Sequence, residues 1–389
     1  MKVVIAHNRY VSTQPSGENT VVDTESRLLT EAGVEVVDFQ RSSDEIPTLP
    51  RGEKLLLPIS PMYARRAQRE LTALLRAHRP DVLHLHNPYP LLSPWVIRTA
   101  HAHGVPVVQT VHNFRHVCVS GVYFRDGHEC RDCLGRRFAL PAIRHSCYRG
   151  SRAQSVIMAT TLAAHRGTWR SVERFLPISP VIAEHLQAYG IPADRITVKP
   201  NAVPDPGRHD QTGEGFVYVG RLVPEKGVTL LLDAWRRYPD GALGTLRIIG
   251  DGPLRDLVAT VAAERTDVTF LGQLPSEGVR AAMRKSAAVV MPSTWNEPYG
   301  LVAVEALANA RPVVVTRCGF LPYLVGDGKA GWVTEPTVEA LADALGRAYK
   351  EAPTLTAAAR ERYETAFTPR VVIDQLIGIY REVSAAGVS

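Results

Sequence analysis

Residues 293–316 read STWNEPYGLVAVEALANARPVVVT, and this stretch gives the clearest indication of the fold class. The run that precedes it, Ala287 to Met291, is apolar and typical of a buried strand. Pro298 and Gly300 mark the entrance of a helix, because residues 301–307 have an apolar, helical pattern. A second apolar run, 313–316, follows that helix. The order strand, loop, helix, strand predicts one unit of a parallel α/β sheet.

Two glutamates of this stretch, Glu297 and Glu305, lie on either side of the predicted helix N-terminus. Free N–H groups and the macrodipole make such a terminus an anion site. A carboxylate on each side can accept hydrogen bonds from sugar hydroxyls. The layout favours a ligand with a phosphate in the middle and a polyol at either end, as in a sugar nucleotide. Two solvated glutamates beside an ordinary helix are the alternative, because this spacing often arises by chance.

Length and composition indicate a globular protein with more than one domain. The chain has 389 residues, of which 45% are hydrophobic and 22% charged. It contains no run of about 18 apolar residues, so we expect no transmembrane helix. The first residues, MKVVIAHNRY, are typical of a first strand and too short in apolar content for a signal peptide. We therefore expect a cytoplasmic protein.

Positive charge gathers in one part of the chain. The formal net charge is +6, and residues 115–174 contain eleven arginines against four acidic residues. Such a stretch could bind nucleic acid, an anionic lipid surface or a phosphorylated acceptor. A solvated loop face is the alternative. Aromatic residues do not alternate regularly with these arginines, which argues against nucleic acid.

Strands and helices alternate along the whole chain, which predicts two doubly wound α/β halves. The segment KPNAVPDPGRHDQTGE, residues 199–214, is rich in proline, glycine and polar residues and is interpreted as the linker. We predict an N-terminal domain over residues 1–203, which includes a cysteine- and arginine-rich segment at 115–152. A C-terminal domain is predicted over 204–368. An amphipathic helix, predicted within 369–389, is expected to pack back toward the N-terminal domain.

Three loops of the C-terminal half have residues suited to a phosphate or a nucleotide. Arg221 and Lys226 lie in GRLVPEKG after a strand, where the guanidinium and the ammonium can bind phosphate oxygens. Gly250 lies in IIGDGP at the end of the next strand, where the backbone must turn tightly or approach a ligand. Leu274 lies in LGQLP after the following strand. Each motif alone also fits an ordinary loop.

Taken together, these motifs resemble the retaining, nucleotide-sugar-dependent glycosyltransferases of family four. The order VGRL-x2-EKG, GDGP, LG-x-L and S-x-W-x-E-P-Y-G-L-x3-E-A-L-A carries the resemblance over residues 219–315. It implies the GT-B fold, with two Rossmann-like domains facing across a cleft.

The resemblance also implies roles for individual residues. Arg221 and Lys226 would bind the donor diphosphate. Glu305 would hold the ribose hydroxyls, and Glu297 a hydroxyl of the donor sugar. The backbone near helix entry would contact phosphate or sugar at Tyr299, Gly300 and Leu301. The sequence departs from the family pattern at a few positions, which bear on the shape of the sugar pocket: Tyr299, Ala310, Cys318 and Tyr323.

The N-terminal half has fewer distinctive residues. Gly17 begins a predicted helix and could present N–H groups to the diphosphate, although an ordinary helix start fits equally. His112 follows a strand in TVHNF, and the resemblance implies contact with the donor sugar. His84 and His86 lie on another strand and are interpreted as facing opposite sides of it. One of them could line the acceptor cleft, or both could be structural.

Four of the five cysteines fall within thirty residues, at Cys118, Cys130, Cys133 and Cys147. A C-x2-C pair with two further cysteines can form a structural zinc site. Disulfides and free thiols are the alternatives, and a cytoplasmic location disfavours disulfides. The resemblance implies that a subset of the family shares this insertion near the acceptor side.

The resemblance implies a retaining transfer from a nucleoside-diphosphate sugar, UDP or GDP with UDP favoured, to a glycan, lipid-linked or small natural-product acceptor. No D-x-D motif is present, so cationic side chains are expected to replace a catalytic metal, and no catalytic cofactor is expected. A peripheral contact with the inner face of an anionic membrane is a further expectation. A sugar-nucleotide epimerase, another GT-B enzyme or a non-catalytic sugar-nucleotide-binding protein are the alternatives.

Overall fold

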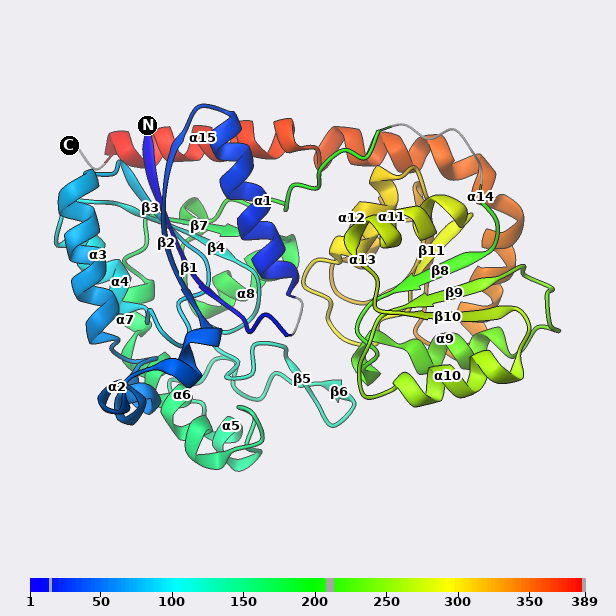
Figure 1. The fold of residues 1–389 in the computed structure, drawn as a ribbon, viewed down its shortest axis with the longest axis horizontal. Helices are drawn as coiled ribbons and strands as arrows, with labels where there is room; N and C mark the ends of the chain where they lie inside the picture. Colours follow the sequence, from blue (N-terminus) through cyan, green and yellow to red (C-terminus); the bar gives the residue numbers. More distant parts are fainter. Residues whose placement is uncertain (14–15, 208–212, 387–389) are drawn as a thin grey trace. The chain divides into compact units, whose positions relative to one another are not determined.

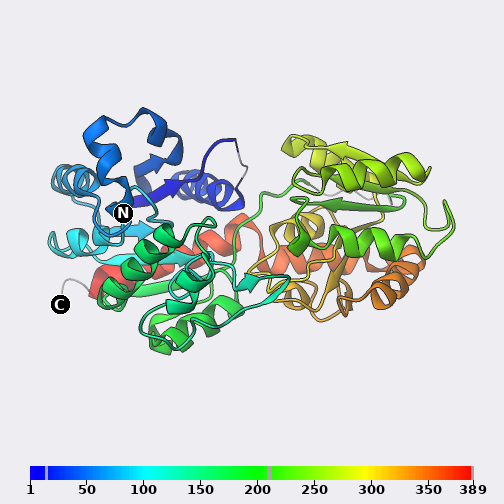
Figure 2. The same ribbon diagram turned by 90° about the horizontal axis from the view of Figure 1, so that it is seen from below.

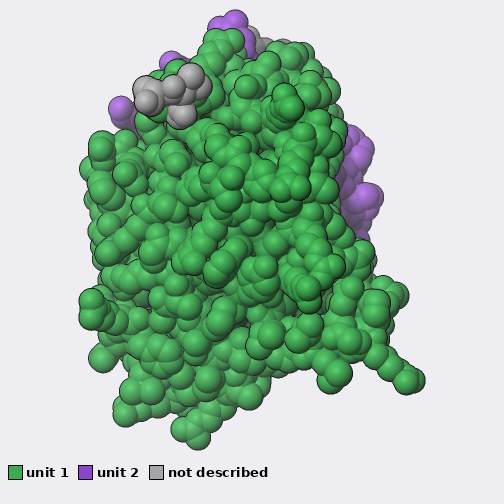
Figure 3. Space-filling model, turned by 90° about the vertical axis from the view of Figure 1, so that its left-hand side faces the viewer, with its two compact units in different colours: residues 1–123, 130–202, 372–389 green, residues 124–129, 203–371 purple. Residues whose placement is uncertain are grey.

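The computed structural model describes residues 1–13, 16–207 and 213–386. Residues 14–15 before the predicted helix start at Gly17, residues 208–212 of the predicted linker and residues 387–389 of the predicted C-terminal segment lie outside these ranges. The chain forms two compact units, drawn in separate colours in Figure 3. Unit 1 comprises residues 1–123, 130–202 and 372–389, and unit 2 comprises 124–129 and 203–371.

Unit 1 contains a parallel sheet of five strands (Figure 1), in the order β2-β1-β3-β4-β7. The strands are β1 (Lys2–Arg9), β2 (Glu35–Ser42), β3 (Val82–Leu85), β4 (Val107–Val111) and β7 (Arg174–Pro177). The strand order reverses between β1 and β3. In open α/β sheets ligands bind outside the carboxyl ends of the strands at such a point.

Helices cover both faces of this sheet. They are α1 (Gly17–Glu31), η1 (Ser43–Thr48), α2 (Arg51–Leu56), η2 (Leu57–Ile59), α3 (Arg65–His78), α4 (Trp95–His101), α5 (Leu140–Arg144), α6 (Arg152–Ala164), α7 (Arg166–Trp169), α8 (Pro180–Tyr189), η3 (Ala193–Arg195) and α15 (Pro369–Ala386). Helix α15 joins the unit 1 core although it ends the chain. Its apolar residues recur every three or four positions, at 373, 376, 379, 380 and 383, and pack with Val3 and Ile5 of β1.

Unit 2 contains a parallel sheet of six strands in the order β10-β9-β8-β11-β12-β13. The strands are β8 (Phe216–Val219), β9 (Leu246–Ile249), β10 (Val268–Gly272), β11 (Ala288–Met291), β12 (Val313–Thr316) and β13 (Gly331–Thr334). This is the Rossmann strand order, and it reverses between β8 and β11. The antiparallel hairpin of β5 (Phe124–Arg125) and β6 (His128–Glu129) also belongs to unit 2.

The helices of unit 2 follow its strands in sequence. They are η4 (Pro224–Lys226), α9 (Val228–Trp235), α10 (Arg255–Glu264), α11 (Ser276–Lys285), α12 (Leu301–Ala308), α13 (Leu321–Leu324) and α14 (Val338–Ala366). The strands on either side of α12, β11 and β12, are buried along their whole length, as their continuous apolar runs predict. The predicted α/β class, with two doubly wound Rossmann-like domains, is confirmed.

One predicted helix is too short. The helical pattern that begins at Thr337 predicts a helix as far as Lys350, whereas α14 runs on to Ala366 with Pro353 inside it. Proline removes one backbone donor and normally ends a helix, but Ala352 and Ala359 on either side of it are buried in this helix. Within the described residues, no helix combines the length and the hydropathy that crossing a bilayer requires.

Candidate active site

The loops after β8 and β11 bring the first candidate residues together. These two strands are neighbours at the point where the unit 2 strand order reverses. Lys226 ends η4 after β8, and Glu297 lies in the loop between β11 and α12. The N–H of Thr294 donates to the carbonyl of Glu225 at 3.0 Å, which ties one loop to the other. The position is the one that ligands occupy in this type of sheet.

Glu297 is the centre of a small hydrogen-bond network. Its Oε2 atom accepts from Lys226 Nζ at 2.6 Å, from Trp295 Nε1 at 3.0 Å and from Ser293 Oγ at 3.1 Å. The residue is 5% exposed. The Lys226 ammonium also lies 5.2 Å from the centre of the Trp295 ring. All three donors bind one oxygen, which orients the carboxylate.

The loop after β12 contacts the backbone of Glu297. The N–H of Phe320 donates to the Glu297 carbonyl at 2.9 Å. Gly319 has φ +57°, and a Cβ there would lie 2.2 Å from the Glu297 carbonyl oxygen. Only glycine allows this approach. The ring of Phe320 stacks on that of Tyr299 at 5.7 Å, so the loop before α12 is held by packing as well.

Glu305 lies in the second turn of α12, and Gly300 caps the helix with φ +95°. Among the described residues no side chain caps this N-terminus. The Ala303 N–H donates to the Gly300 carbonyl at 2.9 Å, which leaves the N–H groups of Leu301 and Val302 for an anion. Leu301 is the first helical residue. Burial raises the pKa of Glu305 to about 7. A carboxyl group that is half protonated at neutral pH can change its hydrogen-bonding role when a ligand arrives.

Three further predicted residues lie at the same edge of the sheet without contacting Glu297. The Arg221 side chain is 63% exposed, and its guanidinium lies 3.9 Å from Glu225. Gly250 follows β9 with φ +147°, and a Cβ would lie 1.8 Å from the carbonyl oxygen of Gly220. Leu274 follows β10 and is half-buried. The structure therefore brings Lys226 and Glu297 together and leaves Arg221 extended toward solvent.

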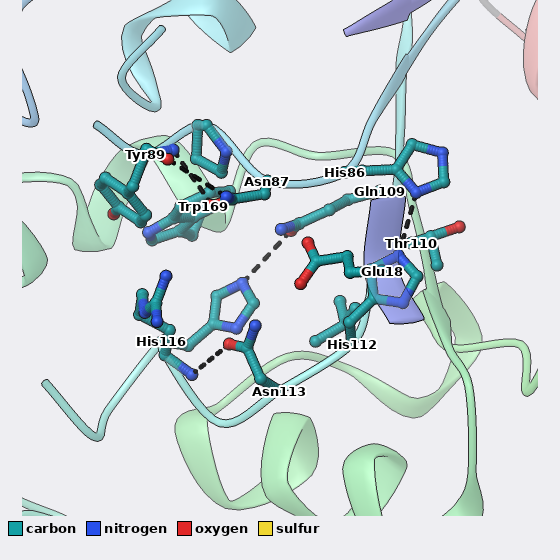
Figure 4. Close-up of a pocket in the computed structure, with 13 residues that line it drawn as sticks. Glu18, His86, Asn87, Tyr89, Gln109, Thr110, His112, Asn113, His116 and Trp169 are labelled. Atoms are coloured by element: carbon teal, nitrogen blue, oxygen red, sulfur yellow. Dashed lines mark hydrogen bonds between the residues drawn. The ribbon is translucent and has the colours of Figure 1, made fainter. Parts of the chain in front are cut away.

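In unit 1, His112 lines a pocket at the carboxyl ends of β3 and β4 (Figure 4). The pocket encloses about 30 Å³, which is room for about two water molecules. His112 Nε2 lies 3.0 Å from His86 Nδ1, and their rings stack at 5.3 Å. Burial lowers the pKa of His112 well below its usual value. The imidazole is therefore neutral at physiological pH.

Several polar atoms of this pocket have no hydrogen-bond partner among the described residues. They are His86 Nε2, Tyr89 Oη, Arg115 Nε, His116 Nδ1 and Trp169 Nε1. Buried polar atoms are normally paired, so these atoms point to a polar ligand or to water. Glu18 of α1 also lines the pocket, and burial raises its pKa to about 7. Apart from His86, sequence reasoning missed these residues, although Arg115 and His116 belong to the arginine-rich segment that it singled out.

Gly17 and the pair His84 and His86 are further residues of unit 1 that the sequence singled out. Gly17 is the first residue of α1 and is exposed, and its neighbour Ser16 makes no side-chain cap. The expectation that His84 and His86 face opposite sides of their strand is wrong. Residues two apart on a strand share a face, and their rings lie 4.3 Å apart. Both contact the buried carboxylate of Glu25, at 3.2 and 3.4 Å.

The cysteines are half-buried and none forms a disulfide. Burial and, to a smaller extent, the nearby thiols of the other three insertion cysteines together raise the pKa of the Cys133 thiol to about 11. Among the described residues, one group of three or more metal-ligating side chains has its ligand atoms within 4.8 Å of one another. That group is Glu25, His84 and His86, so the cysteines are spaced more widely.

Two family models match consecutive parts of the chain, which together cover residues 15–365. Residues 15–205 match the model described as Glycosyltransferase Family 4. Residues 202–365 match the model described as Glycosyl transferases group 1. With its two Rossmann-like sheets, the protein is a glycosyltransferase of the GT-B fold. More particularly, the chain belongs to the family 4 and group 1 type of these enzymes.

Solved structures with the same fold cover almost the whole chain. A sucrose-phosphate synthase from Thermosynechococcus elongatus aligns over 99% of both chains with a TM-score of 0.72 at 21% identity. HepE from Anabaena, crystallised with UDP, aligns over 98% of this chain and 100% of its own with a TM-score of 0.66 at 17% identity. At these identities the likeness shows the fold.

Two relatives are similar in sequence. The phosphatidyl-myo-inositol mannosyltransferase of Mycobacterium leprae is 26% identical over 329 residues, which cover 79% of this chain and 75% of that protein. An uncharacterized glycosyltransferase of Methanocaldococcus jannaschii is 35% identical over 121 residues, 31% of this chain and 33% of that protein. The match thus spans about a third of the archaeal relative.

Proposed function

We propose that the protein is a retaining glycosyltransferase that moves a sugar from a nucleoside-diphosphate sugar to an acceptor hydroxyl. The observation that carries this proposal is the Lys226–Glu297 pair at the point where the unit 2 strand order reverses. Arg221 and the open N-terminus of α12 lie at the same sheet edge. Cations and free N–H groups suit a diphosphate there, and the carboxylate suits a sugar hydroxyl.

The proposed reaction breaks the bond between the anomeric carbon and the diphosphate oxygen. The bonding electrons leave with the diphosphate, whose growing charge Arg221, Lys226 and the α12 N–H groups stabilise. The acceptor hydroxyl attacks on the same face, and a diphosphate oxygen takes its proton. Neither a side-chain nucleophile nor a metal ion is required, because fixed cations supply the charge.

Binding of the donor is proposed to rearrange Lys226. Its ammonium is bound to Glu297, and its side chain is 20% exposed, so a diphosphate can compete for it. Glu297 keeps its bonds from Ser293 and Trp295 and can accept a sugar hydroxyl on Oε1. Glu305 is proposed to hold the ribose diol, with the backbone near Gly250 and Leu274 beside the base. HepE was crystallised with UDP and with UDP-glucose, which supports a UDP-sugar donor.

His112 is proposed to contact the transferred sugar, and the unit 1 pocket, which has room for about two water molecules, is proposed to receive one hydroxyl group of that sugar. Its unpartnered donors and the neutral His116 Nδ1 suit hydroxyl groups, which both donate and accept. The acceptor is proposed to be a glycan, a lipid-linked glycan or a small natural product.

Product stereochemistry tests the retaining reaction. The protein is incubated with UDP-glucose, which has the α configuration, and the first sugar released or transferred is observed by proton NMR before mutarotation. The proposal predicts an α product from wild type and none above background from Lys226→Ala. An initial β product would show inversion and contradict the mechanism.

We also propose that one surface of unit 1 contacts an anionic membrane. Seven of the fourteen exposed large hydrophobic side chains among the described residues lie on it: Leu55, Leu56, Ile59, Tyr63, Phe138, Leu140 and Val156. They belong to α2, η2, α5, α6 and adjoining loops, and η2 packs on α6 as α6 packs on α5. These helices lie along the lower side of unit 1 in Figure 1, the side that faces the viewer in Figure 2.

Exposed arginines lie on these helices or close to them in sequence, at 51, 65, 69, 136, 137, 144, 149 and 152. Apolar side chains with basic neighbours favour insertion into the interface of an anionic bilayer. Co-sedimentation with phosphatidylcholine vesicles, with and without phosphatidylglycerol, tests this. The double variant Leu55→Asp/Leu56→Asp should lose pelleting with anionic vesicles, whereas Leu257→Asp in unit 2 should retain it. Equal pelleting of both variants would contradict the assignment.

Structural zinc at Cys118, Cys130, Cys133 and Cys147 remains a separate proposal. Four thiols, two of them in C-x2-C spacing, are a donor set that zinc prefers. The ion would deprotonate the thiols and draw them together. Metal analysis of the purified protein should find about one zinc per chain in wild type and less in Cys130→Ser. Absence of zinc together with four thiols that react freely would reject the proposal.

A further inference from the structure

A buried ionic cluster lies behind the unit 1 pocket and takes no part in the proposed reaction. Glu25 of α1 accepts from Lys199 Nζ on Oε2 at 2.5 Å. The other oxygen, Oε1, faces His84 Nδ1 at 3.2 Å and His86 Nε2 at 3.4 Å. The side chains of Lys199, His84 and His86 are fully buried, and that of Glu25 is 5% exposed. Burying these charges is costly unless the arrangement is fixed.

The three side chains Glu25, His84 and His86 have a composition that metal ions accept, yet the structure supplies the positive charge in another way. The Lys199 ammonium neutralises the carboxylate directly. With that charge provided, the second oxygen of Glu25, Oε1, is a fixed negative group beside two imidazole rings, and it accepts no hydrogen bond from the described residues.

The carboxylate determines which nitrogen of His86 carries its proton. A lone pair on Nε2 would face the lone pairs of Oε1 across 3.4 Å in a buried site, so the proton must lie on Nε2. In a neutral His86 ring, Nδ1 is then an acceptor. That atom lies 3.0 Å from His112 Nε2, which must donate to it.

The tautomer of His112 follows from that of His86. Burial keeps its ring neutral by lowering its pKa, so it has one N–H, and that N–H is used toward His86. His112 Nδ1 therefore presents a lone pair, and His112 lines the pocket. An acceptor at this position suits a sugar hydroxyl that donates its proton.

The other groups that surround the cluster have their own partners. His84 Nε2 lies 2.7 Å from Thr110 Oγ1, and its Nδ1 lies 2.6 Å from the hydroxyl of Tyr380 on α15. His7 Nε2 lies 3.0 Å from Asn19 Oδ1, and its Nδ1 accepts from the Asn87 N–H at 3.4 Å. Neither ring competes for the contact between His86 and His112.

We propose that Glu25 is a positioning residue for the transfer reaction, which fixes the tautomers of His86 and His112 so that His112 Nδ1 faces the sugar as a hydrogen-bond acceptor. The part of this proposal that concerns the reaction rests on the proposed function of His112. The tautomer sequence itself depends only on the contacts of unit 1.

Nitrogen NMR of protein labelled with ¹⁵N-histidine tests the tautomers without any substrate. In wild type, the proposal predicts a protonated Nε2 and an unprotonated Nδ1 on both His86 and His112. A protonated Nδ1 on His112 would overturn it, because the relay would then run in the opposite direction. The wild-type spectrum decides this even if variants fold poorly.

Two variants extend the test. Glu25→Gln replaces one carboxylate oxygen with an NH2 donor. With the amide oxygen held by Lys199, the NH2 group faces the imidazoles and should move His112 away from its wild-type tautomer. Tyr380→Phe is the matched control, because it removes a hydroxyl from the His84 side of the same cluster and should leave the His112 signals unchanged. The proposal is overturned if Glu25→Gln retains the wild-type tautomers, or if Tyr380→Phe disturbs them equally.

Kinetics separates the two proposals. Glu25→Gln should lower kcat about 10- to 100-fold, the usual effect of removing an orienting partner, and leave the KM for UDP-glucose nearly unchanged. An unchanged kcat with altered tautomers would refute the positioning role and leave the proposed function standing. If wild type transfers no sugar but shows the predicted tautomers, the proposed function fails and the tautomer assignment survives.

Discussion

Each unit holds one buried glutamate bound to a lysine, and the two pairs differ in exposure. Glu297 and Lys226 lie 2.6 Å apart in unit 2, and the lysine side chain is 20% exposed. Glu25 and Lys199 lie 2.5 Å apart in unit 1, and the lysine side chain is fully buried. Because Lys226 is partly exposed, it can leave Glu297 and bind a ligand. Lys199 is fully buried, so the Lys199–Glu25 pair can only fix the positions of neighbouring side chains. The same two residue types are therefore suited to different roles.

The largest expected effect concerns stability in unit 1. Lys199→Met leaves the Glu25 carboxylate buried without its cation, and removing one partner of a buried pair typically costs about 3–5 kcal/mol. Lys226→Met should cost only about 1–2 kcal/mol, because Glu297 keeps two other donors. Urea unfolding of both variants measures the difference. Equal losses would show that the two pairs are not distinct.

The next effect concerns activity in unit 2. Lys226→Ala should lower kcat/KM about 10²–10³-fold, because a charge that stabilises the departing diphosphate is lost. Lys350→Ala, an exposed residue of α14, is the control and should behave as wild type. Initial rates of sugar release from UDP-glucose provide the measurement. A Lys226→Ala protein with wild-type rates would remove this lysine from the mechanism.

A smaller effect concerns pH. Burial raises the pKa of Glu305 to about 7, and only the ionised form accepts hydrogen bonds from a ribose diol on both oxygens. One unit below a pKa, about a tenth of a carboxyl group is ionised. The affinity for UDP-glucose should therefore rise up to about tenfold from pH 6 to pH 8. Calorimetric titration of wild type and Glu305→Gln checks this, since the variant should bind weakly and without the pH slope.

The smallest effect on stability is expected at Arg221, where a substitution should change donor binding but not the melting temperature. Arg221 is 63% exposed and lies 3.9 Å from Glu225, and exposed ion pairs contribute about 0–1 kcal/mol. Arg221→Ala should leave the melting temperature of the free protein nearly unchanged and weaken UDP-glucose binding. A large drop in melting temperature would assign Arg221 a structural role instead.

The Glu297 loop of unit 2 could be located from the sequence because regular strand and helix patterns flank it. Its donors Ser293 and Trp295 were not predicted, although they lie within five positions of Glu297. The contact between Lys226 and Glu297 was not predicted either, since it needs the adjacency of β8 and β11. The strand order supplies that adjacency.

The unit 1 cluster could not be predicted for a physical reason. Glu25 occupies the middle of an amphipathic helix, where a glutamate is normally solvated. Its partner Lys199 is 174 positions away, and Tyr380 arrives from the C-terminal helix. One signal was available: His84 and His86, two apart on a strand, share a face. Applied correctly, that rule would have predicted a buried imidazole pair in need of an acceptor.

A thermal-shift panel of UDP-, GDP-, ADP- and TDP-sugars shows whether the Lys226–Glu297 site of unit 2 binds a nucleotide-sugar donor. The panel compares wild type with Lys226→Ala and Glu305→Gln. A donor at 100 times its Kd should stabilise the wild-type protein by about 2.7 kcal/mol, and both variants should lose most of that shift. If no nucleotide sugar stabilises the wild type, or if both variants respond as the wild type does, the unit 2 pair does not bind the donor.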